Sequence, residues 1–321
     1  MSSRKHPVTL LTGFLGSGKT TLLRRLLEHP GMGETAVIVN ELGQVPLDHH
    51  LVRAVDERTV VLASGCVCCT MRGDLAEELR DLFSRRIRYE IPDFHRVVVE
   101  TTGLADPAPV LYTLLTEPVV RHHFELECVV TTVDAVNGLD QLDRQPESVK
   151  QAAVADRLVV TKTDIAALED VESLEARLRG INPAAALMRV EFGDVDPAEL
   201  LQAADRAARE LDLQPPAHTG HVHAFSIELD EEVDWTAFGV WLTMLLQSRG
   251  QDILRVKGLV NTGGDGPLVL NGVQHVIHPP EHLPAWPDDD RRSRLVFIAR
   301  GVSREEVERS LRAFNRAAAA V

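Results

Sequence analysis

The stretch Gly13-Phe14-Leu15-Gly16-Ser17-Gly18-Lys19-Thr20 decides the fold. It matches the pattern G-x-x-x-x-G-K-[ST] at every fixed position. The apolar run Pro7–Thr12 before it predicts a buried strand, and Lys19–Glu28 after it predicts a helix. Glycines let backbone N–H groups converge on phosphate oxygens, and a helix N-terminus adds partial positive charge. The stretch therefore predicts a phosphate-binding loop, in which Lys19 reaches the β- and γ-phosphates and the Thr20 hydroxyl ligates Mg²⁺.

Apolar runs alternate with helix-like segments as far as Val190. The predicted strands after the loop are Thr35–Asn40, Arg58–Ala63, His95–Glu100, Leu126–Val133, Arg157–Thr161 and Ala184–Val190, and Met71–Arg88 is a predicted helix. This alternation predicts an α/β domain of the P-loop NTPase type, with a mostly parallel sheet covered by helices on both faces.

The pattern changes at Leu213–Gly220, where adjacent prolines and a glycine predict a linker. The segments predicted beyond it are the strands His221–Leu229, Ile253–Asn261, Pro267–His278 and Arg294–Ala299 and the helices Asp234–Ser248 and Arg304–Ala317. They predict a small α+β domain with an antiparallel sheet. The expected domains are thus 1–212, which binds nucleotide, a linker at 213–220, and 221–321.

Two further segments have the composition of nucleotide-binding loops. Glu100 ends a buried strand, the position that faces Mg²⁺ in P-loop NTPases, and the backbone N–H of Gly103 after it is expected to reach the γ-phosphate. In Thr161-Lys162-Thr163-Asp164, the carboxylate can accept two hydrogen bonds from guanine, and the lysine stem can cover the base. The usual GTPase form of this loop begins with Asn, where this sequence has Thr161.

Three cysteines crowd into Ser64-Gly65-Cys66-Val67-Cys68-Cys69-Thr70. In a regular strand, Cys66 and Cys68 would point one way and Cys69 the other, so all three reach one metal only if the chain turns. Thiolates favour Zn²⁺ or Cu(I) over Mg²⁺, and Zn²⁺ takes about four ligands. Candidates for the fourth ligand are water, Glu41, His49 and His50. The alternatives are buried structural cysteines, as Cys128 is expected to be, or a redox pair, for which no thioredoxin-like helix start is present.

Together these motifs resemble the CobW-type family of metal-handling GTPases, which includes zinc chaperones, cobalt-linked proteins and nitrile hydratase activators. The resemblance includes Val-Asn-Glu-Leu-Gly (39–43) and Glu-Thr-Thr-Gly-Leu-Ala-Asp-Pro (100–107), and continues through Asp252–Gly258 and Arg291–Ile298. It implies slow GTP hydrolysis coupled to binding a transition metal and handing it to a client metalloprotein. Matched residue by residue, the resemblance implies Gly16, Gly18, Lys19, Thr20 and Thr21 for phosphates and Mg²⁺, Lys162 and Asp164 for guanine, and Cys66, Cys68 and Cys69, with Glu41 close by, for the metal. From the motifs themselves, Gly13 and Ser17 are also expected at the phosphates, and Lys19, Glu100 and Gly103 are expected to serve hydrolysis.

The expected cofactors are GTP or GDP, Mg²⁺ and Zn²⁺, with Co²⁺ or Fe²⁺ as alternative metals. The loops after Thr35–Asn40 and Arg58–Ala63 are expected to follow neighbouring strands, so nucleotide state can alter the metal shell. No arginine finger is evident, so intrinsic turnover is expected to be slow and to need a partner or a homodimer. The competing interpretations are a P-loop kinase and a nucleotide-gated module with a structural metal.

Composition sets outer bounds on function. The chain has 321 residues, 34 Lys plus Arg and 48 Asp plus Glu, for a formal net charge of −14. This balance argues against a duplex-DNA or anionic-membrane surface. No run of about eighteen apolar residues and no signal peptide is evident, so a cytoplasmic protein is expected. Histidines that form either a weak loading site or an ordinary surface are His122, His123, His218, His221 and His223.

Overall fold

The structure, a computed structural model, describes residues 5–40, 60–64, 71–201 and 222–318. The chain divides into two compact units. One comprises Met1–Arg177 with Ala185–Ala203, and the other comprises Leu178–Ala184 with Ala204–Val321. The predicted linker at 213–220 lies outside the described residues.

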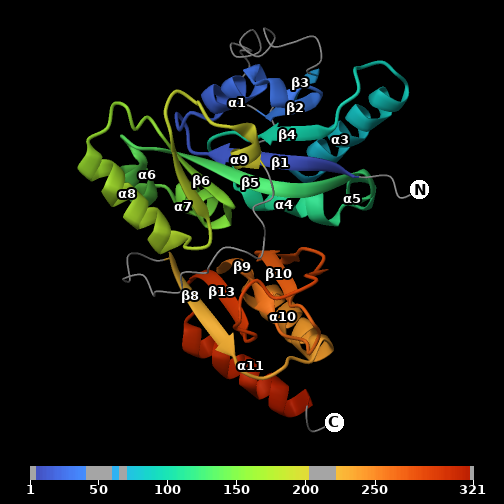
Figure 1. The fold of residues 1–321 in the computed structure, drawn as a ribbon, viewed down its shortest axis with the longest axis vertical. Helices are drawn as coiled ribbons and strands as arrows, with labels where there is room; N and C mark the ends of the chain where they lie inside the picture. The colour runs from blue at the N-terminus through green and yellow to red at the C-terminus, as the bar shows by residue number, and fades with distance from the viewer. Residues whose placement is uncertain (1–4, 41–59, 65–70, 202–221, 319–321) are drawn as a thin grey trace. The chain divides into compact units, whose positions relative to one another are not determined.

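In the N-terminal unit, the described strands form a seven-stranded sheet in which every pair is parallel (Figure 1). Its strands are β1 (His6–Gly13), β2 (Thr35–Asn40), β3 (Val60–Ser64), β4 (Arg96–Glu100), β5 (Phe124–Asp134), β6 (Arg157–Thr161) and β7 (Ala186–Val190). The order across the sheet is β3-β2-β4-β1-β5-β6-β7. The predicted α/β class with a parallel sheet is confirmed.

Helices cover both faces of this sheet. The helices of the unit are α1 (Lys19–Glu28), a 3₁₀ turn η1 (Pro30–Met32), α3 (Met71–Ile87), α4 (Pro107–Thr116), α5 (Pro118–His123), α6 (Gly138–Arg144), α7 (Pro146–Val154), α8 (Leu168–Ile181) and α9 (Pro197–Leu201). On one face α1 and α9 pack against β1 and β5, and on the other lie α4 and α7 (Figure 1). The leucines of α1 at 22, 23, 26 and 27 repeat with helical spacing and are buried against valines of the sheet.

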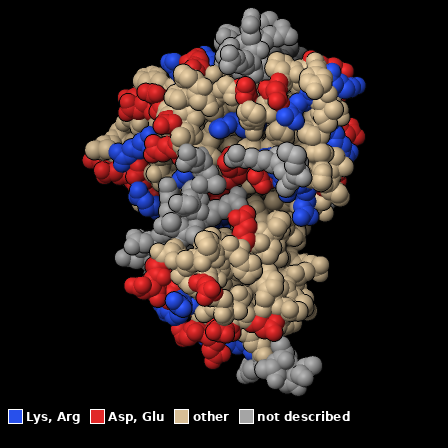
Figure 2. All heavy atoms as spheres, turned by 45° about the vertical axis from the view of Figure 1, so that its right-hand side comes forward, with Lys and Arg blue, Asp and Glu red and all other residues tan. Residues whose placement is uncertain are grey.

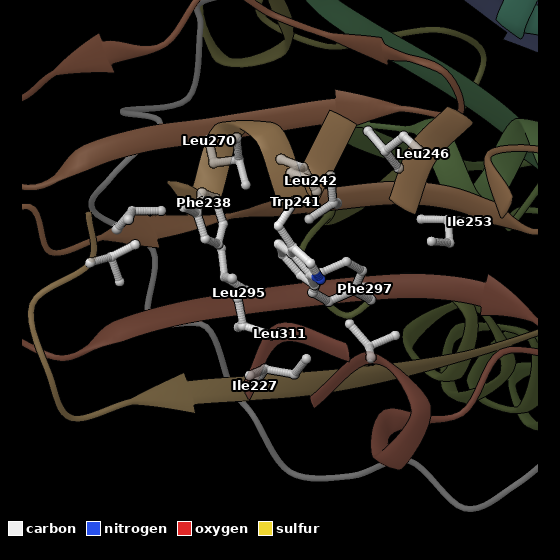
Figure 3. Close-up of a cluster of buried hydrophobic side chains, with 14 of the residues drawn as sticks. Ile227, Phe238, Trp241, Leu242, Leu246, Ile253, Leu270, Leu295, Phe297 and Leu311 are labelled. Carbon is white, nitrogen blue, oxygen red and sulfur yellow. The ribbon is translucent and has the colours of Figure 1, made fainter. Parts of the chain in front are cut away.

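The C-terminal unit is an antiparallel sheet packed against two helices. Its elements are β8 (Val222–Leu229), α10 (Trp235–Arg249), β9 (Ile253–Val260), β10 (Leu268–Val273), β11 (Val276–Ile277), β12 (Glu281–His282), β13 (Ser293–Arg300) and α11 (Arg304–Ala318). Among the described residues the sheet order is β11-β10-β9-β13-β8, with β12 pairing β10. Phe238 and Trp241 of α10 and Phe297 of β13 lie at the centre of its core (Figure 3). The predicted small α+β domain is confirmed.

One predicted strand is wrong. The apolar run Pro267–His278 does not form a single strand, because the chain reverses between β10 and β11 and pairs Val273 with Val276. Gln274 at this reversal has φ 51°, a left-handed conformation uncommon for a residue other than glycine. The turn residues Gln274 and His275 are not Gly, Pro or Asn, and the turn-like pair Asn271-Gly272 lies inside β10 instead.

The outer surface of the described residues is mixed in charge. On the face drawn in Figure 2, their Lys and Arg side chains lie scattered among Asp and Glu and do not gather into one basic surface. None of the described helices is long and apolar enough to cross a membrane.

Candidate nucleotide site

The carboxyl end of the parallel sheet brings the predicted loops together. The Cα partners across adjacent strands are Leu11 with Glu100, Gly13 with Thr132 and Asp134 with Thr161. The phosphate loop after β1, the acid that ends β4 and the Thr-Lys-Thr-Asp loop after β6 therefore leave the sheet along one edge. Ligands of open α/β sheets bind outside this edge.

The phosphate loop depends on glycines whose backbone is left-handed or tightly packed. Gly13, Gly16 and Gly18 have φ values of 139°, 72° and 91°. A Cβ at Gly13 would lie 2.4 Å from the carbonyl oxygen of Thr132, so only glycine fits there. Lys19 is buried, and its Nζ donates hydrogen bonds to the carbonyl oxygens of Gly13 (2.9 Å) and Phe14 (3.1 Å). The Lys19 side chain thus lies across the phosphate loop, whose bound phosphates it is predicted to contact.

Buried side-chain hydroxyl groups form hydrogen bonds that hold the phosphate loop in place. Ser17 and Thr132 share a side-chain hydrogen bond of 2.7 Å. Thr161 donates from Oγ1 to the carbonyl oxygen of Ser17 at 2.8 Å. Thr161 stands where the usual GTPase loop has Asn, and its shorter hydroxyl braces the phosphate loop directly.

The predicted Mg²⁺ ligand and the strand-end acid lie in contact. Thr20 Oγ1 donates to Glu100 Oε1 at 2.7 Å, and Glu100 is only 4% exposed. A hydroxyl and a carboxylate are hard oxygen donors, the kind that Mg²⁺ prefers. The donor set at this position therefore fits Mg²⁺.

Gly103 lies directly against the phosphate loop. A Cβ at Gly103 would sit 2.5 Å from the backbone nitrogen and 2.7 Å from the Cα of Leu15. The segment before it is also attached to β1, because Thr101 Oγ1 donates to Thr12 Oγ1 at 2.9 Å. The segment after Glu100 is thus close enough to the phosphate loop to respond to what that loop binds.

The Thr-Lys-Thr-Asp loop, predicted to read the base, forms a partly buried ion pair with the end of β5 that the sequence analysis did not predict. Lys162 has φ 59°, and its Nζ donates to Asp134 Oδ2 at 2.8 Å. Asp134 is 1% exposed; burial raises the pKa of its carboxyl, but hydrogen bonds from Lys162 and other donors outweigh burial and hold the pKa below its usual value. The pair fixes the lysine stem, while Asp164 is exposed at the loop. Asp134, like Glu100, is an acid at the end of a buried strand, and this pattern could have identified it from the sequence.

The predicted metal ligands fall outside the described residues. These are Glu41, Cys66, Cys68 and Cys69, with the alternatives His49 and His50, and the same holds for His218 and His221. The described residues flanking them are paired, because Asn40 at the end of β2 and Ser64 at the end of β3 are Cα partners. The two segments therefore leave neighbouring strands, as predicted.

Other metal-ligating groups in the described part of the chain do not assemble. Among the described residues, no group of three or more His, Cys, Asp or Glu could hold a metal ion. His123 stacks on Phe83 with ring centroids 3.8 Å apart, and burial, together with the neighbouring His122, lowers the pKa of its imidazole. Cys128 is buried in the core beside α1 and α9, as predicted.

Comparison with known proteins covers both units. Residues 7–189 match the family model described as CobW/HypB/UreG, nucleotide-binding domain, and residues 222–315 match the one described as cobalamin synthesis protein cobW C-terminal domain. The chain is 34% identical over 308 residues to a protein named zinc chaperone YjiA from Escherichia coli, covering 94% of this chain and 96% of that protein. It is 29% identical over 350 residues to a zinc chaperone CobW from Pseudomonas aeruginosa, with coverage of 96% and 91%.

The solved structures agree. The crystal structure of Zn(II)-bound YjiA GTPase from Escherichia coli superposes with a TM-score of 0.77 at 30% identity, covering 97% of this chain and 99% of that one. Sequence and fold are thus shared over nearly the full length.

Proposed function

Because the chain belongs to the CobW family of P-loop GTPases, we propose that it is a GTP-hydrolysing metallochaperone, which binds Zn²⁺ at its C-x-C-C segment and hands it to a client metalloprotein. The observation that carries the proposal is the full-length similarity to proteins named zinc chaperones, in a chain that keeps an intact phosphate loop and the three clustered cysteines. Residues 1–212 are the GTPase domain, 213–220 the linker and 221–321 the C-terminal domain.

Hydrolysis of GTP uses the residues gathered at the carboxyl edge of the sheet. The backbone of Gly13 to Thr21 cradles the phosphates, and the Lys19 ammonium contacts the β- and γ-phosphates. Thr20 and Glu100 would hold Mg²⁺, and the ion would neutralise phosphate charge. The Gly103 N–H donates to the γ-phosphate, so the segment after β4 distinguishes GTP from GDP.

The guanine base is read by the loop after β6. The Asp164 carboxylate accepts hydrogen bonds from guanine N1–H and N2–H₂, a pair of donors that adenine does not offer. The stem of Lys162 covers the base, and its bond to Asp134 keeps the stem in place. The contact of Thr161 with Ser17 links this loop to the phosphate loop.

The metal is the protein's cargo, and the pairing of β2 with β3 supports its proposed site. Asn40 and Ser64 are Cα partners. Glu41 immediately follows Asn40, and Cys66 lies two residues beyond Ser64. The ligands are Cys66, Cys68 and Cys69, with Glu41 as the fourth. Zn²⁺ suits three thiolates and an oxygen, and Co²⁺ or Fe²⁺ would bind such a set less tightly than Zn²⁺.

Nucleotide state and metal affinity are coupled through this shared edge. Val39 of β2 and Leu11 of β1 are both Cα partners of Glu100, so the proposed metal loops and the phosphate loop flank the same strand end. GTP orders these loops and closes the metal site, and hydrolysis loosens it and releases the metal to the client.

Replacing Cys66 and Cys68 by Ala tests the metal site. A zinc-binding free energy of about 10–16 kcal/mol spread over about four ligands is about 3 kcal/mol each, so each loss is expected to weaken zinc binding about 100-fold. A zinc titration against a competing chelator checks this, with metal analysis of protein purified from cells and GDP affinity measured in parallel. The expected result is near-stoichiometric zinc in the wild type, about 100-fold weaker zinc binding with less zinc retained in each variant, and unchanged GDP affinity.

Cys128→Ala is the matched control, because Cys128 is the fourth cysteine and lies in the core on β5, whereas the proposed ligands follow β2 and β3 in the sequence. It is expected to keep its zinc. Variants of Cys66 and Cys68 that retain as much zinc as Cys128→Ala would rule the proposed site out.

A further inference from the structure

Two side chains of helix α7 grip the segment that follows Glu100. Gln151 donates from Nε2 to the carbonyl oxygens of Gly103 (3.2 Å) and Ala105 (3.0 Å). Lys150, the preceding residue, donates from Nζ to Asp106 Oδ2 at 2.7 Å. We refer to Gln151 and Lys150 as the α7 clamp. The clamp therefore contacts the segment at three points within four residues.

The clamped segment has the phosphate loop as another neighbour. Gly103 touches the Leu15 backbone closely enough that a Cβ there would clash. Thr101 is attached to β1 by its backbone N–H, which donates to the carbonyl oxygen of Leu11 at 2.9 Å. Any shift of Gly103 relative to the phosphate loop must therefore stretch or break the bonds to Gln151.

The base of the clamp is rigid. Gln151 is fully buried, and its backbone carbonyl accepts a 2.9 Å hydrogen bond from Thr131 Oγ1 on β5. At its other end α7 stops at Val154, and β6 begins at Arg157 and runs to the base-reading loop. The clamp is thus anchored to the sheet rather than to a surface loop.

The backbone of a glycine depends more than that of other residues on hydrogen bonds from neighbouring side chains to hold its conformation. Without a Cβ, Gly103 has more backbone conformations open to it, so its peptide groups are less well oriented by the chain itself. Hydrogen bonds to the carbonyls of Gly103 and Ala105 fix those peptides. The effect of a misplaced catalytic contact is large, on the order of 100-fold in rate for about 1 Å.

We propose that Gln151, supported by Lys150, is a positioning residue for GTP hydrolysis, because its hydrogen bond to the Gly103 carbonyl restrains the residue whose N–H is proposed to contact the γ-phosphate. The proposal rests on the GTPase reaction and on the proposed γ-phosphate contact of Gly103. It does not depend on the metal site. Gln151 acts through Gly103, and no direct contact of Gln151 with the nucleotide is proposed.

Gln151→Met tests the proposal, because Met keeps the length and volume of the side chain and removes the donor. We expect kcat for phosphate release to fall about 30-fold, within the range set by small misplacements. KM for GTP and Kd for GDP should stay within about three-fold, since neither the phosphate loop nor the base-reading loop is altered. Lys150→Met, at a partly exposed position, is expected to lower kcat by about three-fold in the same assay.

Thr35→Val is the matched structural control. It removes a buried hydrogen bond to the carbonyl oxygen of Met32 at the start of β2 and leaves the clamp and its anchor in place. It should lower the Tm without changing kcat. All assays are run in Mg²⁺ with no transition metal, so failure of the metal proposal does not affect them.

Gly103→Ala separates the clamp from the contact that it positions. Its Cβ would clash with Leu15, and we expect hydrolysis to be lost. If Gly103→Ala is inactive while both clamp variants hydrolyse GTP at the wild-type rate, the clamp proposal is overturned and the role of Gly103 stands. If all three variants hydrolyse normally, both are overturned. If Thr35→Val loses as much kcat as Gln151→Met, the loss reflects general destabilisation and the proposal is overturned.

Discussion

Replacing Asp164 by Asn is expected to change the preferred base from guanine to xanthine. The carboxylate can accept from both N1–H and N2–H₂ of guanine, whereas the Asn amide has one acceptor and a donor that would face the N2 donor. Two opposed donors leave both without partners, and sites built around such hydrogen bonds reject the wrong ligand by on the order of 10⁴-fold. Xanthine carries a carbonyl oxygen at this position, which the Asn amide can donate to.

The measurement is the Kd of the protein for GTP and for XTP. GTP affinity should fall by on the order of 10⁴-fold, and XTP should become the tighter ligand. Asp170→Asn makes the same chemical change on α8, at an exposed position six residues further on, and should leave both affinities unchanged. If Asp164→Asn bound GTP as tightly as Asp170→Asn does, Asp164 would not read the base.

Replacing Lys19 by Met is expected to remove hydrolysis almost entirely. Met matches the length of the lysine stem and takes away the ammonium group that is proposed to stabilise charge on the β- and γ-phosphates. Removing one such preorganised donor costs on the order of 10²–10³-fold in kcat. Phosphate release under saturating GTP measures the loss, and circular dichroism melting shows that the fold is kept.

Arg25→Met provides the control on the same helix. Arg25 is exposed and pairs with Glu28 at 3.1 Å, and no contact of its guanidinium with the nucleotide is proposed. An exposed ion pair contributes at most about 1 kcal/mol to stability. Arg25→Met should hydrolyse GTP normally, and equal activity in the two variants would contradict the assigned role of Lys19.

Local pattern predicted the parts of the nucleotide site that lie close together in sequence. The phosphate loop, its flanking strand and α1 are one continuous stretch, so Gly18 and Lys19 are placed by local geometry alone. Glu100 and the Thr-Lys-Thr-Asp loop were predictable because each follows a buried strand, and carboxyl ends of parallel strands meet at one edge.

Contacts between distant segments were not predictable from that pattern. Asp134 pairs with Lys162 across 28 positions, and Thr132 bonds Ser17 across 115. Which hydroxyls and carboxylates meet depends on the strand order, in which β1 separates β4 from β5, and hydrophobic periodicity carries no information on that order. The hydrogen bonds of Gln151 to the segment after Glu100 have the same origin.

GTP and the metal are proposed to occupy coupled sites at the carboxyl end of one sheet. Zinc is therefore expected to bind more tightly to the GTP-bound protein than to the GDP-bound protein, by at least about five-fold, the lower end of ordinary coupling between sites. The reciprocal must hold, so zinc should raise the preference of the protein for the GTP analogue over GDP by the same factor.

The direct measurement is a zinc titration against a competing chelator, performed on protein loaded with GDP and on protein loaded with a nonhydrolysable GTP analogue. A tighter Kd in the GTP-analogue state, lost together with zinc binding in Cys66→Ala, is the predicted result. Equal zinc affinity in the two nucleotide states would contradict the account.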